Sequence, residues 1–179
     1  GEFEKTLQDG EDTTTGRLDT RFSGPSFDPL GKEADYDPLV AAIGSAYVTA
    51  FNDYARRVLH YGGDRPFHPF AEHMGPWDMR HRGPDGGMLD GALDVIPDLA
   101  TAMKYDPNLH VLLNSGYFDL ATPFFEGVYE MAHLPIPDVL QHNIEIRDYP
   151  SGHMVYANEA ALRQLHDNVA DFIRRTSHR

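Results

Sequence analysis

Apolar residues recur at steps of three or four in two long stretches of the chain, a spacing that places them on one face of a helix. The first stretch follows Asp37-Pro38, a helix start signal, because Asp caps a helix and Pro suits its first position. Its apolar stripe consists of Leu39, Ile43, Tyr47, Ala50, Tyr54 and Val58. Gly44 could divide this helix, and we expect Gly62-Gly63 to end it.

The second stretch begins near Asn158 and predicts a C-terminal helix. We expect its apolar face to consist of Leu162, Leu165, Val169, Phe172 and Ile173. Two shorter helices are predicted before it, at residues 95–104 and 121–133. Asp94 caps the first of these, and Asp106-Pro107 ends it, since proline does not continue a helix. The face of the other consists of Phe124, Val128 and Met131 or Ala132.

Two strands are predicted between these helices. Residues 111–113 form an apolar run that breaks at Gly116. Residues 143–149 alternate between the apolar Ile144 and Ile146 and their charged neighbours, which is the period of a strand. The order helix–strand–helix–strand–helix predicts an α/β fold in which two parallel strands are packed under helices. Functional groups are expected at the carboxyl ends of the strands.

The segments 1–36 and 61–88 carry turn signals and no clear apolar periodicity. We expect the first to be an irregular surface loop, although Leu18 and Phe22 could attach it to a core. The second is crowded with Pro, Gly and His around Trp77, and we expect a lid or a substrate-facing loop.

Four histidines in or beside the second segment raise the question of a metal site: His60, His68, His73 and His81. The run from His68 to His73 has one residue too many for the H-x-x-E-H zinc pattern. Pro69 also disrupts the helix that this pattern needs. We therefore predict no metal site.

Composition narrows the class of protein. The 179 residues suffice for one domain with its own core, and 41% hydrophobic against 24% charged residues favours a folded chain. A net charge of −13 disfavours binding to nucleic acid or to an anionic membrane. There is no cysteine, and no apolar run reaches the ~20 residues of a membrane span. The first residues lack the basic start and apolar middle of a signal peptide, so we expect the interior part of a longer protein.

An acid and a histidine follow the two predicted strands. Asp119 comes just after the break at Gly116, and His153 follows the turn at Ser151-Gly152. In an acyl-transfer triad, an imidazole takes the proton of a serine hydroxyl, and a buried carboxylate fixes the imidazole tautomer. Gly152 permits the close backbone approach that such a histidine loop needs. An Asp after a strand is also a common turn former, and a lone His is commonly structural.

Two stretches carry a resemblance to a known family. Residues 114–123 read NSGYFDLATP, and residues 152–154 read GHM. They resemble the serine carboxypeptidases of peptidase family S10, in particular the bacterial branch, in which the acid lies in an S/N-G-x-x-D motif and the histidine in G-H-M. Further matching positions are Gly16-Arg17-Leu18-Asp19 with Arg21-Phe22, the start of the helix between Tyr36 and Tyr54, Pro76-Trp77 and Asp106-Pro107.

The resemblance implies the C-terminal part of an α/β-hydrolase fold. Residues 1–108 would be a helical insertion or lid region with connecting loops, and residues 109–179 would be the part of the core that carries the acid and the histidine. Asp119 would orient His153, His153 would act as general base and then general acid, and Met154 would line the substrate pocket.

The nucleophile implied by the resemblance is not in this chain. It is expected in a G-E-S-Y-G elbow, on an N-terminal part that would be the partner of these residues, and the oxyanion hole would lie there too. Ser115 and Ser151 are too close in sequence to Asp119 and His153 to replace it, so we interpret both as structural.

The predicted activity is therefore cofactor-free hydrolysis of C-terminal peptide bonds, in which the substrate is a peptide with a free C-terminal carboxylate. The resemblance also implies an extracytoplasmic location, periplasmic or secreted. Two alternatives remain open. The same scaffold could act as an esterase or acyltransferase, or it could be a non-catalytic, hydrolase-like binding module.

Overall fold

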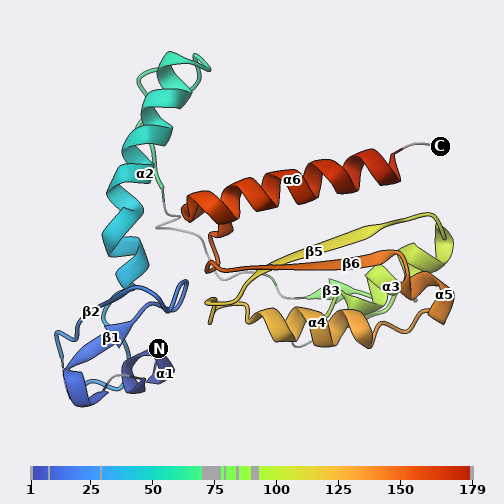
Figure 1. Ribbon diagram of the computed structural model, residues 1–179, viewed down its shortest axis with the longest axis horizontal. Coiled ribbons are helices and arrows are strands. Elements are labelled where there is room, and N and C mark those ends of the chain that lie inside the picture. Colours follow the sequence, from blue (N-terminus) through green and yellow to red (C-terminus); the bar gives the residue numbers. More distant parts are fainter. Residues whose placement is uncertain are drawn as a thin grey trace. The chain divides into compact units, whose positions relative to one another are not determined.

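The computed structural model describes residues 2–7, 9–28, 30–69, 78, 80–83, 85–89 and 93–177 (Figure 1). The chain divides into two compact units, one of Gly1–Arg17 and Phe22–Trp77, the other of Leu18–Arg21 and Asp78–Arg179. The second unit contains a parallel pair of strands and several helices, so the mixed α/β class is confirmed. The sequence analysis predicted a different kind of division, with residues 1–108 as an insertion and residues 109–179 as a catalytic core. Because that division is defined by function, it stays a prediction.

The first unit begins with short elements. α1 (Glu2–Thr6) and the 3₁₀ helix η1 (Asp9–Glu11) precede an antiparallel pair, β1 (Thr13–Thr15) and β2 (Ser23–Pro25). The expectation that the first 36 residues are irregular is therefore wrong at these elements. Strands of three residues are too short to show an alternation in the sequence, and β2 contains both Gly and Pro, which strands normally avoid.

The long helix of the first unit is α2 (Pro38–Arg57). Its predicted start is confirmed, since the Asp37 carboxylate accepts the Leu39 backbone N–H at 2.9 Å. Gly44 does not divide it, and it ends at Arg57, before the left-handed turn at Gly62 and Gly63. The apolar stripe is largely exposed: Leu39 is buried, whereas Tyr47, Tyr54 and Val58 are not.

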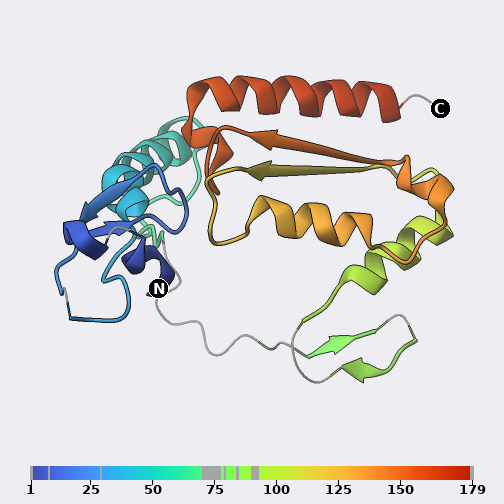
Figure 2. The same ribbon diagram turned by 60° about the horizontal axis from the view of Figure 1, so that its bottom comes forward.

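The second unit is organised around two parallel strands, β5 (Val111–Gly116) and β6 (Ile144–Tyr149). Their register pairs Val111 with Ile144 at one end and Gly116 with Tyr149 at the other. The prediction of a parallel pair is confirmed. α4 (Phe124–Ala132) lies on one face of the strands and α6 (Glu159–Thr176) on the other (Figure 2).

Shorter elements complete this unit. They are the antiparallel pair β3 (His81–Arg82) and β4 (Met88–Leu89), the helices α3 (Ile96–Tyr105) and α5 (Asp138–Gln141), and the 3₁₀ helix η2 (Val155–Ala157). The helix predicted at 95–104 is confirmed within one residue, and the Asp94 carboxylate accepts the Ile96 N–H at 3.0 Å. α5 has four residues and lies between Pro137 and the start of β6. It was not predicted because a single helical turn shows no periodicity.

Two apolar clusters hold the strands in place. On the face of α4, buried Met103, Met131 and Leu140 pack with Leu113 and Ile146 of the strands. On the face of α6, the core consists of Tyr149, Val155 and Ala161, with Leu165 packed against it. The alternation of Ile and charged residues in β6 therefore separates an apolar face from the face that meets α6.

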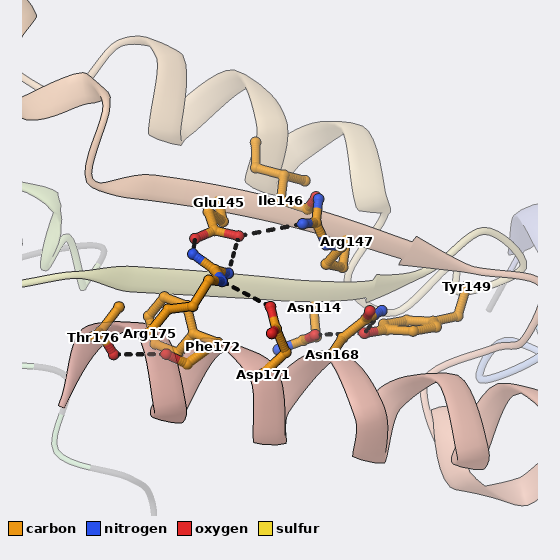
Figure 3. A network of polar contacts seen from close by, with 10 residues as sticks. All are labelled: Asn114, Glu145, Ile146, Arg147, Tyr149, Asn168, Asp171, Phe172, Arg175 and Thr176. Carbon is orange, nitrogen blue, oxygen red and sulfur yellow. Dashed lines mark hydrogen bonds and ion pairs between the residues drawn. The ribbon is translucent and has the colours of Figure 1, made fainter. Parts of the chain in front are cut away.

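α6 contacts β6 through a polar network as well as through apolar side chains (Figure 3). Arg175 donates to both carboxylate oxygens of Glu145 at 2.9 Å and to Asp171 at 2.7 Å. Deeper in, Asn168 donates to the Tyr149 hydroxyl at 3.1 Å, and that hydroxyl donates to Asn114 at 2.8 Å. These polar contacts shift the buried face of the helix away from the predicted stripe.

The predicted apolar face of α6 is thus only partly right. Leu165, Val169 and Phe172 are partly buried, but Leu162 and Ile173 are exposed. Ala161, outside the predicted stripe, is fully buried. A small residue at this position lets the helix approach the sheet closely. A stripe defined by large apolar side chains does not include such a residue.

The predicted start of α6 near Asn158 is confirmed, and the cap that the structure shows there can be tested. The Asn158 side-chain oxygen accepts the Ala161 N–H at 3.0 Å. Replacing Asn158 with Ala leaves that donor without its partner, and we expect a loss of about 1 kcal/mol in the free energy of unfolding. Urea unfolding measures it, with Asn108→Ala as the control, since the Asn108 side chain makes no hydrogen bond to the described residues. Equal stability of the two variants would contradict the assigned cap.

Candidate active site

Asp119 lies in a tight turn after β5 and is buried. One carboxylate oxygen, Oδ1, accepts the backbone N–H groups of Ala121 at 2.7 Å and Thr122 at 3.0 Å. The other, Oδ2, faces His153, whose Nδ1 lies 2.8 Å away. The same side chain therefore forms a turn with one oxygen and holds an imidazole with the other.

This turn explains where the next helix begins. A helix was predicted from residue 121, but α4 starts at Phe124. The N–H groups of Ala121 and Thr122 are already bound to the Asp119 carboxylate, and Pro123 then precedes the first helical residue. Because α4 starts late, Ala121 and Thr122 remain in the turn that positions the carboxylate. The difference between the predicted and the observed start of the helix is therefore a feature of the site.

His153 follows β6 after the turn at Ser151-Gly152. Its backbone N–H donates to the carbonyl oxygen of Leu18 at 2.7 Å, and its side chain is 44% exposed, against 4% for that of Asp119. A carboxylate can only accept, so the contact assigns the proton of a neutral ring to Nδ1. The lone pair of Nε2 is then available to take a proton from another group.

Thr122 is a third member of this group, and the sequence analysis missed it. Its hydroxyl lies 2.6 Å from Asp119 Oδ2 and 3.2 Å from His153 Nδ1. The hydroxyl hydrogen goes to the carboxylate, and the hydroxyl oxygen then faces the Nδ1–H. A usable signal was present, because a Thr three residues after a turn-forming Asp is placed to bond back to it.

The hydrogen bonds set the charge of Asp119. Burial raises its pKa, but the hydrogen bonds from the Thr122 hydroxyl and N–H, from His153 and from the Ala121 N–H outweigh burial and lower the pKa below its usual range. The carboxylate is therefore ionised over the whole neutral range, as an acceptor for an imidazolium must be.

A pH dependence of stability follows from this shift. Because the pKa of Asp119 is lower in the folded chain than in the unfolded chain, its contribution to stability is present above about pH 4 and is lost as the pH falls through the folded value. We expect the difference in urea midpoint between the wild type and Asp119→Asn to be largest near pH ~6 and to shrink by pH ~2. A difference that grows on acidification would contradict the assigned shift.

Two glycines allow close backbone approaches around the site: Gly116 where the loops of Asp119 and His153 meet, and Gly152 where the His153 loop meets Leu18 and Asp19. A Cβ at Gly116 would lie 2.5 Å from the Ser151 carbonyl oxygen and closer still to that of Gly152. A Cβ at Gly152 would lie 2.5 Å from the Cβ of Asp19 and closer still to the Leu18 carbonyl oxygen. Real Cβ atoms do not approach this closely, so both positions require glycine.

A cleft of about 510 Å³ opens beside the pair. It is lined by Asp119, Thr122 and His153 together with residues of β5 and α4, among them Ser115, Gly116 and Glu126. Met154 is partly buried and is not among the residues of the described chain that line this cleft, so its substrate-binding role stays a prediction.

The serines do not complete the site. Ser151 is fully buried and its hydroxyl accepts from Arg21 at 3.2 Å, and Ser115 is part of β5. No hydrogen bond joins a serine hydroxyl to His153 in the part of the chain that the structure describes. In the triad predicted from the sequence, the serine would therefore come from other residues.

The histidines considered for a metal are only partly within the described residues. His73 lies outside them, as does Pro76-Trp77. His81 pairs with Asp98, with 2.8 Å between Nε2 and Oδ2. Among the residues that the structure describes, no group of three or more His, Asp or Glu side chains is placed to hold a metal ion.

Comparison with known proteins gives no match: no protein-family model, no curated protein and no solved structure is similar to this chain. None of the described helices has the length and apolar character needed to cross a membrane.

Proposed function

We propose that this chain is the C-terminal part of a serine-type carboxypeptidase with an α/β-hydrolase fold, as its resemblance to peptidase family S10 implies. The observation that carries the proposal is the 2.8 Å contact between Asp119 Oδ2 and His153 Nδ1. The two residues follow neighbouring parallel strands, where α/β folds place their functional groups. The extracytoplasmic location and the absence of a cofactor remain part of the same proposal.

The reaction would proceed through an acyl-enzyme. His153 Nε2 takes the proton of a serine hydroxyl while the serine oxygen attacks the carbonyl carbon of the last peptide bond. Asp119 stabilises the imidazolium, which then gives the proton to the departing amino group as the C–N bond breaks. Water repeats the sequence on the ester, releases the shortened peptide and restores the serine.

The serine would be supplied by an N-terminal part of the same protein. The cleft beside His153 is also lined by Ser115 and Gly116, and a segment carrying the hydroxyl would enter this cleft to reach the ring. The oxyanion hole and the groups that bind the substrate carboxylate would also come from that part.

A substrate comparison tests the activity. We expect the protein extended by its N-terminal part to hydrolyse a blocked dipeptide with a free C-terminal carboxylate, and to hydrolyse the corresponding C-terminal amide at least tenfold more slowly. A carboxypeptidase recognises the terminal carboxylate, and burying an unpaired amide in its place is unfavourable. Equal rates would favour the esterase or acyltransferase alternative.

A non-catalytic binding module is the second candidate, because no serine of the described chain is bound to His153. Intact-mass analysis of the protein purified from its natural source separates the two. A polypeptide with a G-x-S-x-G elbow, either continuous with this chain or co-purifying with it, supports the enzyme. A folded species of 20.1 kDa alone supports the module.

A further inference from the structure

Four residues far from the acid and the histidine in sequence contact both of their loops. These are Leu18–Arg21, which belong to the second unit although the residues on either side belong to the first. The Thr20 N–H donates to the carbonyl oxygen of Phe118 at 2.9 Å, next to Asp119. The Leu18 carbonyl accepts the N–H of His153 at 2.7 Å. The segment therefore connects the two loops through backbone hydrogen bonds.

Asp19 and Arg21 add side-chain contacts to this connection. Arg21 donates to both oxygens of Asp19, from Nε at 2.9 Å and from Nη2 at 2.6 Å. The same guanidinium donates to the carbonyl oxygen of Pro150 at 2.8 Å and to the Ser151 hydroxyl at 3.2 Å. Within the part of the chain that the structure describes, its polar contacts beyond Asp19 thus fall on the loop that ends in His153.

The guanidinium also reaches the other loop. Its central carbon lies 5.0 Å from the centre of the Phe118 ring, within the range of a cation–π contact. The hydrogen bond with Asp19 raises the pKa of Arg21, so the group is permanently charged. Asp19 is buried, with its side chain 2% exposed, and a buried carboxylate needs its partner in place.

We propose that Asp19 and Arg21 are positioning residues for the Asp119–His153 pair. They would act by holding the two loops at a fixed separation, without touching the substrate or the reacting atoms. The catalytic consequence rests on the function proposed above, but the geometric claim does not. The claim that these two residues fix the separation of the loops is tested directly by observing the hydrogen bond from His153 Nδ1 to Asp119.

The chain offers a matched control. Asp78 and Arg80 have the same spacing and the same forked contact, from Nε at 3.0 Å and from Nη2 at 2.8 Å. Their side chains are 61% and 66% exposed, and no contact of the described residues joins Arg80 to either loop. Changing Arg80 removes an exposed ion pair of the same geometry and so controls for the loss of the fork itself. A difference between the Arg21 and Arg80 variants then reports the burial of Asp19 together with the contacts of Arg21 with the loops.

The test uses the full-length protein and two measurements. In NMR spectra, the Nδ1–H proton of His153 is expected as a slowly exchanging downfield resonance in the wild type and in Arg80→Met. In Arg21→Met it should be lost or broadened at a temperature where circular dichroism shows the fold intact. Arg21→Lys, which keeps the charge but not the fork, should restore it in part.

Activity gives the second measurement. We expect kcat to fall about 100-fold in Arg21→Met with little change in KM, since a misplacement of about 1 Å in a catalytic group has an effect of that size. Arg80→Met should stay within about twofold of the wild type. An unchanged His153 resonance in folded Arg21→Met would overturn the proposal. A wild-type protein that shows the resonance but cleaves no peptide would overturn only the proposed function.

Discussion

In the proposed carboxypeptidase, replacing Asp119 with Asn is expected to lower kcat by about 10⁴-fold, the loss seen when a triad histidine is held in the wrong tautomer. The hydrogen bonds fix which way the new amide points. The position of Oδ1 accepts two backbone N–H groups, so it must be taken by the amide oxygen. The NH₂ group then faces His153 Nδ1, which has to accept, and the ring proton moves to Nε2, where it blocks proton transfer from serine.

Thr122→Val is the matched control for this prediction. It removes the hydroxyl that lies 2.6 Å from Asp119 Oδ2 but leaves the carboxylate, its backbone donors and His153 in place. One hydrogen bond to a charged group is lost, so we expect a decrease of about tenfold in kcat. Steady-state rates with a blocked dipeptide measure both variants. An Asp119→Asn enzyme as active as Thr122→Val would contradict the orienting role.

The sequence was sufficient to predict the elements that carry the site. The alternation in β6, the apolar run in β5 and the apolar periodicity after Asn158 are local signals, and each gave an element close to its observed bounds. The pairing of Asp119 with His153 could be anticipated because parallel neighbours bring their carboxyl ends to the same edge. In addition, the turn-forming and imidazole-holding interpretations of Asp119 both apply, since each uses a different oxygen.

The contacts that surround this pair could not be predicted in the same way. Leu18–Arg21 lie more than a hundred positions before His153, and no local pattern indicates that a turn-rich segment will pack beside a distant strand end. The buried Ala161 and the polar contacts of Arg175 likewise depend on how α6 approaches the sheet. These contacts are determined by tertiary packing, and the apolar periodicity of a single helix does not indicate them.

Backbone contact between the two loops gives the second large effect. Gly116→Ala places a methyl group 2.5 Å from the Ser151 carbonyl oxygen and closer to that of Gly152, and both are backbone atoms that cannot rotate away. The loops must separate, so we expect a loss of about 3 kcal/mol in the free energy of unfolding. The hydrogen bond between His153 and Asp119 should weaken with it, and kcat should fall by at least about 100-fold.

Gly44→Ala is the control that isolates this cause. Its new methyl would meet only a side-chain carbon of Val40 at 3.6 Å, an ordinary contact within α2. Because Ala favours a helix over Gly, this variant should be more stable than the wild type by up to about 1 kcal/mol. Both variants add one methyl group to a glycine. Urea unfolding is expected to show a loss of stability for Gly116→Ala and a gain for Gly44→Ala. If Gly116→Ala were also neutral or stabilising, the loops that hold Asp119 and His153 would not be in contact, and the separation of the pair would have to be set elsewhere.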